Sequence, residues 1–74
     1  MKLPIISARD CIRALQRGGF YIDRQVGSHI VMYRDDPYAK VIVPEHSTLK
    51  PGTLKSILRQ AGLTVDEFDA LLKK

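Results

Sequence analysis

The sequence lacks most of the residues on which disulfide, metal-thiolate or membrane structures depend. Tryptophan is absent, and the single cysteine, Cys11, excludes an intramolecular disulfide and a zinc site built from several thiolates. No apolar run approaches the roughly 20 residues that a membrane-spanning helix needs. The segment Met1–Ile6 is too short and too interrupted for a signal peptide. We therefore expect a soluble, cytoplasmic protein with no membrane contact.

Several common catalytic sequence patterns are also missing. The chain has no glycine-rich phosphate loop, no dinucleotide-binding fingerprint and no paired histidine–glutamate helix motif for zinc. The two histidines stand on different segments, and Asp35 and Asp36 precede Pro37, where turn formation accounts for them. We expect a protein that needs neither a metal ion nor another cofactor.

What remains is a short basic chain. Its 74 residues make one domain, residues 1–74, and its 45% hydrophobic content is typical of a globular protein. Twelve Lys and Arg against eight Asp and Glu give a net charge of +4. A positive balance favours polyanionic partners, but RNA, DNA, an anionic membrane and an acidic protein remain open on charge alone, as does a merely solvated surface.

Residue spacing predicts a first helix followed by three strands. Ser7 is a helix cap, and apolar residues then recur with the period of one buried helical face at Ala8, Cys11, Ile12 and Leu15. Gly18 and Gly19 end this helix, which we expect over residues 7–17. Branched and aromatic runs predict strands, separated by turn residues, at 20–25, 29–34 and 40–44. Short turns between them indicate an antiparallel meander.

Two further helices are expected in the last third of the chain. Pro51 is typical of a first helical turn, and the stripe of Leu54, Ile57, Leu58 and Ala61 ends at Gly62. Thr64 and Glu67 form a capping box for a short last helix, whose buried face is expected to hold Val65, Phe68, Leu71 and Leu72. The predicted class is α+β: an α-β-β-β-α order with a three-stranded antiparallel sheet covered on one face by helices, plus a short C-terminal helix.

The strongest catalytic candidate is His29, which follows Gly27 and Ser28 at the head of the second strand. An imidazole has an unperturbed pKa of about 6.5, so it exchanges protons near neutral pH. The glycine allows close backbone approach, and Ser28 can bond a phosphate oxygen or orient the ring. The strand alternates His29, Val31 and Tyr33 against the intervening apolar residues, and the sequence leaves open which face the helices cover.

Other residues are candidates for supporting roles on an RNA substrate. His46 is a possible second catalytic or RNA-contacting histidine, although a surface loop residue is the simpler interpretation. Basic side chains that can contact phosphates are Arg24, Lys50, Lys55 and Arg59, with the last two one helical turn apart. Tyr21, Tyr33 and Tyr38 are able to stack on bases, but packing over the sheet is the favoured interpretation for at least one of them.

Three stretches carry a resemblance to a known family. They are Gly27-Ser28-His29, Val43-Pro44-Glu45-His46, and the run from Leu49 through Gly62; Leu3–Ser7 and the Gly18-Gly19-Phe20 corner also fit. With these the chain resembles the HicA toxins of bacterial and archaeal toxin–antitoxin systems, over nearly its whole length. In that family the position before the Gly-Ser-His corner is often basic; here it is Val26, with Arg24 close by.

The resemblance implies a fold like the double-stranded-RNA-binding domain and a metal-independent endoribonuclease that cleaves messenger RNA. It also implies that the corner histidine, His29, is needed for cleavage, and that a cognate HicB-type antitoxin neutralises the protein. Two other readings of the residues remain open. One is a non-catalytic RNA-binding module of the same fold, and the other is an interaction protein whose basic face serves an acidic partner.

Overall fold

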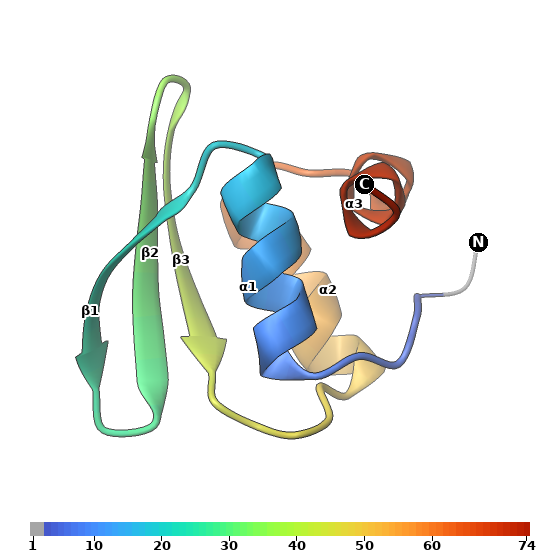
Figure 1. Ribbon diagram of the computed structural model, residues 1–74, viewed down its shortest axis with the longest axis horizontal. Coiled ribbons are helices and arrows are strands. Elements are labelled where there is room, and N and C mark those ends of the chain that lie inside the picture. Colours follow the sequence, from blue (N-terminus) through green and yellow to red (C-terminus); the bar gives the residue numbers. More distant parts are fainter. Residues whose placement is uncertain (1–2) are drawn as a thin grey trace.

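The chain folds into a three-stranded antiparallel sheet with helices packed against one of its faces (Figure 1). The computed structural model describes residues 3–74, so Met1 and Lys2 of the expected domain lie outside the described residues. The elements are α1 (Ala8–Arg17), β1 (Tyr21–Val26), β2 (His29–Asp35), β3 (Tyr38–Pro44), α2 (Pro51–Ala61) and α3 (Val65–Leu72). The predicted α+β class and element order are confirmed.

The residues expected to begin and end the helices do so. Ser7 caps α1 by accepting a hydrogen bond from the Asp10 backbone N–H at 3.2 Å. Thr64 and Glu67 bond to each other's backbone N–H at 3.1 and 2.8 Å, which completes the capping box of α3. Gly62 ends α2 with a φ of +71°. These local signals are reliable because they satisfy backbone groups that have no partner within the helix.

The strand boundaries differ from the expected ones by one or two residues. Phe20 lies outside β1, because its backbone N–H donates to the Leu15 carbonyl and its ring is buried in the core. The other two strands are longer than expected. Asp35 and Tyr38 pair with each other, which leaves only Asp36–Pro37 in the turn.

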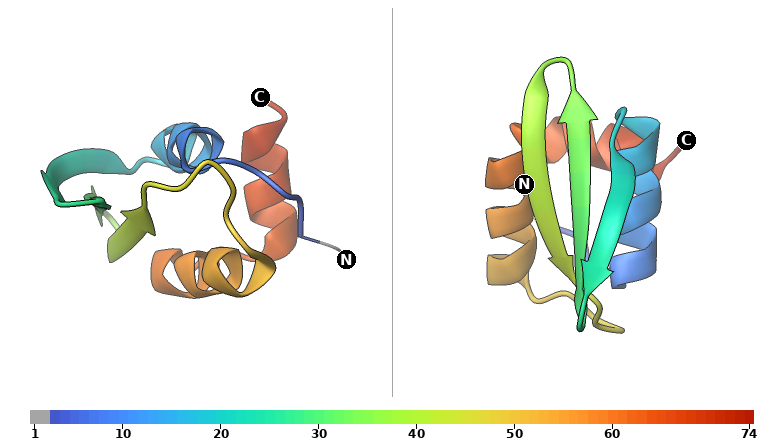
Figure 2. Two further views of the ribbon diagram at one scale, coloured as in Figure 1. Left: turned by 90° about the horizontal axis from the view of Figure 1, so that it is seen from below. Right: turned by 90° about the vertical axis from the view of Figure 1, so that its left-hand side faces the viewer.

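Strand pairing shows which face of the sheet is buried. Ile30 and Met32 of β2 belong to the core cluster, together with alternate residues of β3. His29, Val31 and Tyr33 therefore lie on the opposite face. Within residues 3–74 no helix covers that face, as Figure 2 shows in the view onto the sheet.

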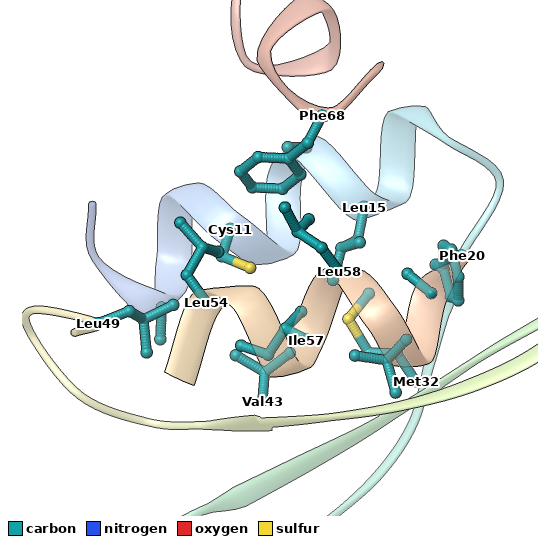
Figure 3. Packing of buried hydrophobic residues seen from close by; sticks show 14 of the residues in the cluster. Cys11, Leu15, Phe20, Met32, Val43, Leu49, Leu54, Ile57, Leu58 and Phe68 are labelled. Atoms are coloured by element: carbon teal, nitrogen blue, oxygen red, sulfur yellow. The ribbon is translucent and has the colours of Figure 1, made fainter. Parts of the chain in front are cut away.

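The core fills the space between the sheet and the helices (Figure 3). Cys11 is fully buried there, as expected, and all four residues of the predicted α2 stripe are buried. Of the expected inner face of α3 only Phe68 is fully buried. Val65, Leu71 and Leu72 are partly buried and pack against the core cluster.

The two edge strands of the sheet differ in how far their backbone groups are protected. At the β3 edge, the Ile42 backbone N–H donates to the Gln60 side chain at 3.0 Å, and Pro44 has no N–H to expose. The β1 edge is open, and a bulge between Ile22 and Arg24 interrupts its pairing with β2. Among the described helices none has the length and apolar character needed to cross a bilayer.

Candidate active site

A tight hairpin places His29 at the start of β2. Val26 and His29 pair across the hairpin, so the turn consists of Gly27 and Ser28 alone. Gly27 has a φ of +60° and Ser28 keeps a negative φ, which matches a type II′ turn. Glycine is the residue that adopts the first of these conformations without strain. The Gly-Ser sequence therefore makes His29 a strand residue with a defined backbone position.

The end of β3 holds this hairpin from its other side. The Glu45 backbone N–H donates to the Ser28 carbonyl at 2.7 Å, one step beyond the last β2–β3 pair. The Gln25 side-chain amide donates to the Gly27 carbonyl at 3.0 Å and to the Glu45 carboxylate at 3.1 Å. The turn directly before His29 is thus held by the Gln25 side chain of β1 and by the Glu45 backbone at the end of β3.

The imidazole itself is exposed to solvent, on the helix-free face of the sheet. Its cross-strand neighbours are Val26 on β1 and Pro44 on β3, neither of which carries a charge. A ligand approaching this face meets the ring without displacing part of the fold. This arrangement suits proton transfer, which requires a fixed side chain within hydrogen-bond reach of the substrate.

Arg24 lies on the same face as His29, at a diagonal position on β1. It pairs with Val31, and such diagonal side chains are about 7–8 Å apart, within reach of an arginine. Its guanidinium contacts the neighbouring Asp23 carboxylate at 2.6 Å. Both side chains are largely exposed, so this ion pair is weak and leaves Arg24 able to contact an incoming phosphate.

His46 lies at the same end of the sheet, but it contacts the helix side of the molecule. Its carbonyl accepts the backbone N–H of Ala8, the first residue of α1, at 3.0 Å. Its side chain lines a hollow of about 660 Å³ beside α1. Besides His46, the hollow is lined by Ser7, Ala8, Arg9, Ile12, Arg13, Gln16, Ile22, Ile30, Glu45 and Ser47. His29 is not among the described residues that line it.

The expected basic residues of α2 are distributed along that helix. Lys50 is its N-cap residue, at the end of the molecule where β2 begins (Figure 1). Lys55 and Arg59 are exposed and one turn apart on the solvent side of α2, further from this end. The structure thus groups the hairpin with Arg24, places His46 and Lys50 at the same end, and separates Lys55 and Arg59 from them.

Two arginines of α1 were missed as site residues in the sequence. Arg9 and Arg13 line the hollow together with His46. Arg17 continues their four-residue spacing, and this spacing is the signal that places all three on one side of a helix. Arg17 has a structural role, because it donates hydrogen bonds at 2.9 and 3.4 Å to two carbonyls at the end of α3.

Two groups elsewhere have pKa values above their ordinary range. Burial raises the pKa of the Cys11 thiol to about 12, so it is not a nucleophile at neutral pH. The Asp35 carboxylate accepts a hydrogen bond from the Tyr21 hydroxyl at 3.0 Å and raises the pKa of that phenol. Both groups stay protonated near neutral pH. Within residues 3–74, no group of three His, Cys, Asp or Glu side chains is placed to hold a metal ion.

A comparison with protein families matches residues 8–63 to the family described as the HicA toxin of bacterial toxin–antitoxin systems. The matched range runs from the start of α1 to just beyond α2, and it contains the hairpin of His29 and the connection that carries His46. A comparison with curated proteins gave no match.

Proposed function

The chain belongs to the HicA toxin family, and from this premise we propose that it is an endoribonuclease that cleaves messenger RNA with His29 as its general acid–base residue. Membership of the family makes it the toxin of a toxin–antitoxin pair, with a cognate antitoxin as its partner. The nuclease activity, the role of His29 and the RNA contacts are the proposal.

The proposed reaction needs only proton transfer and a bound phosphodiester. His29 removes the proton of a ribose 2′-hydroxyl, and the 2′-oxygen attacks the adjacent phosphorus. The bond from phosphorus to the 5′-oxygen breaks, and that oxygen takes a proton from the imidazolium or from water. The products are a 2′,3′-cyclic phosphate and a 5′-hydroxyl. Positioned proton transfer of this kind contributes about 10²- to 10⁴-fold to a rate, and no metal ion is required.

The observation that carries the proposal is the exposed His29 on a rigid hairpin. The Gly27-Ser28 turn before it is held by the Gln25 side chain and by the Glu45 backbone, while His29 is exposed and open to a ligand. Arg24 on the same face and Lys50 at the same end supply positive charge for the RNA backbone. His46, with Arg9 and Arg13 in the adjacent hollow, supplies further phosphate contacts to the RNA on the helix side.

Incubation of the purified protein with RNA in EDTA tests this function. We expect cleavage to continue in EDTA, with 2′,3′-cyclic phosphate and 5′-hydroxyl ends on the fragments. Intact RNA that is nonetheless bound with salt-sensitive affinity would support the non-catalytic RNA-binding module instead. Intact RNA with no binding would point to an interaction protein.

A further inference from the structure

The sheet face that carries His29 also carries three tyrosines in a row. Tyr21 of β1, Tyr33 of β2 and Tyr38 of β3, which we call the tyrosine row, have neighbouring ring centroids 6.4 and 6.2 Å apart. Tyr38 is 71% exposed and Tyr21 is 46% exposed, while Tyr33 is half-buried between them. The row lies toward the end of β2 opposite to His29.

These rings do not belong to the hydrophobic core. The core cluster is made by the other face of the sheet and the helices. Two more apolar side chains, Val26 and Ile42, are 58% and 39% exposed on the tyrosine face. Exposed aromatic and apolar side chains that gather on one face of a small protein indicate a site of interaction.

Two basic side chains, Lys40 and Arg24, share this face with the aromatic rings. The Lys40 ammonium lies 5.9 Å from the centroid of the Tyr33 ring, and Arg24 stands between the row and His29. Rings that accept bases, with cations beside them that contact phosphates, are the combination that binds single-stranded nucleic acid. Two carboxylates lie close to these groups, Asp35 bonded to the Tyr21 hydroxyl and Asp23 paired with Arg24. The positive balance that fits a polyanion is that of the whole chain, +4.

We propose that the tyrosine row is a base-stacking platform that holds single-stranded RNA across the helix-free face of the sheet and leads it to His29. This inference rests on the proposed function, because it takes His29 as the point of cleavage. Tyr33 is four residues from His29 along β2, a distance of about 13 Å at roughly 3.3 Å per residue. A dinucleotide with its phosphate at His29 does not span this distance, whereas a longer strand does.

The binding test uses the His29→Ala protein, so that the RNA stays intact. The probes are a short unstructured oligoribonucleotide and the same strand annealed to its complement. Tyr38→Ala should weaken binding of the single strand by roughly 5- to 150-fold, the effect of one lost base stack. Duplex binding should hardly change, because paired bases are not free to stack on protein rings.

Two matched variants control this experiment. Tyr38→Phe keeps the aromatic ring and should bind the single strand like the parent. Ile5→Ala removes a similarly exposed apolar side chain (76% exposed) from the N-terminal segment, away from the sheet, and should also have no effect. Equal binding of the single strand by Tyr38→Ala and Tyr38→Phe would overturn the inference.

A cleavage test with His29 present separates the two proposals. Tyr38→Ala should raise the KM for the long RNA and leave cleavage of a dinucleoside monophosphate unchanged, which also shows that the variant is folded. Equal loss of activity on both substrates, or no loss on either, would contradict the platform.

If the parent protein cleaves neither substrate, the nuclease proposal fails, while the binding test still decides whether the tyrosine row binds RNA. If Tyr38→Ala loses antitoxin binding and keeps RNA binding, the row is a protein interface and the inference is wrong.

Discussion

At the residue scale, the position of His29 depends on the backbone conformation of Gly27. Gly27 has a φ of +60°, and a methyl group added there would meet no atom within 4 Å. Any effect of a side chain at this position is therefore due to the backbone alone. A left-handed conformation costs a residue with a Cβ about 1–2 kcal/mol.

Gly27→Ala should accordingly lower the free energy of unfolding by about 1–2 kcal/mol, measured by urea denaturation. Gly52→Ala is the matched control, because Gly52 also has free space around it but lies in the first turn of α2. There alanine should stabilise the protein by about 0.5–1 kcal/mol. Changes of the same sign in both variants would contradict the assigned turn.

Cys11 gives a pH-dependent prediction. Burial raises its pKa from 9.0 to about 12, so between these values the folded state keeps a proton that the unfolded state has lost. Stability should therefore be unaffected below about pH 9 and fall as the pH rises above it, by at most about 1.4 kcal/mol per pH unit.

Comparison with Cys11→Ala isolates this contribution, since the variant retains every lysine and tyrosine that titrates in the same range. Unfolding free energies of the two proteins, measured in urea across the alkaline range, should converge or cross in favour of the variant as the pH rises. Parallel curves would show that the thiol is not buried in the way described.

At the element scale, Arg34 joins the end of the sheet to the end of α2. Its Nε donates to the Pro37 carbonyl at 2.9 Å, and its Nη2 donates to the Ala61 carbonyl at 3.1 Å. Its guanidinium also lies 4.7 Å from the centroid of the Phe20 ring. The Arg34 guanidinium thus bonds at the same time to the β2–β3 turn and to the last residue of α2.

Removal of this group in Arg34→Ala should lower the free energy of unfolding by about 2 kcal/mol, because charged hydrogen bonds to two carbonyls are lost. Arg34→Lys should recover only part of this stability, since an ammonium cannot reproduce the fork of the guanidinium. Urea denaturation measures both. Full recovery by lysine would show that charge, and not geometry, is what matters at this position.

The elements were predictable where a local signal was present. Ser7, Thr64 and Gly62 mark helix ends through their own backbone contacts, and the helices accordingly follow the sequence closely. The strands were less predictable. Whether Asp35 belongs to a strand or to a turn depends on its pairing with Tyr38, which no local pattern records.

The site was predictable in part for the same reason. The Gly-Ser corner indicates a tight turn that exposes the next residue, and His29 is exposed. Both faces of β2 carry apolar side chains, so the sequence could not show that the helices cover Ile30 and Met32 and leave His29 open. The hollow lined by Arg9 and His46 joins residues far apart in the chain, and it becomes visible only in the folded structure.

At the scale of the whole molecule, one end combines the His29 hairpin, His46 and the start of α2. An antitoxin that neutralises the protein by covering its site should bury either His29 or the surface formed by Lys55 and Arg59. Diethyl pyrocarbonate measures the accessibility of His29, and an amine acetylating reagent measures that of Lys55. Both reagents are applied to the free protein and to the antitoxin complex. We expect protection of His29 in the complex. A neutralised complex in which both surfaces react as in the free protein would indicate an indirect mechanism.

The most direct test of the whole account compares cleavage of one RNA by the parent protein and by His29→Ala, in EDTA, with RNA affinity measured alongside. We predict that the variant loses about 10²- to 10⁴-fold in cleavage rate while its affinity for the RNA is largely kept. Cleavage by His29→Ala at the parental rate would contradict the account.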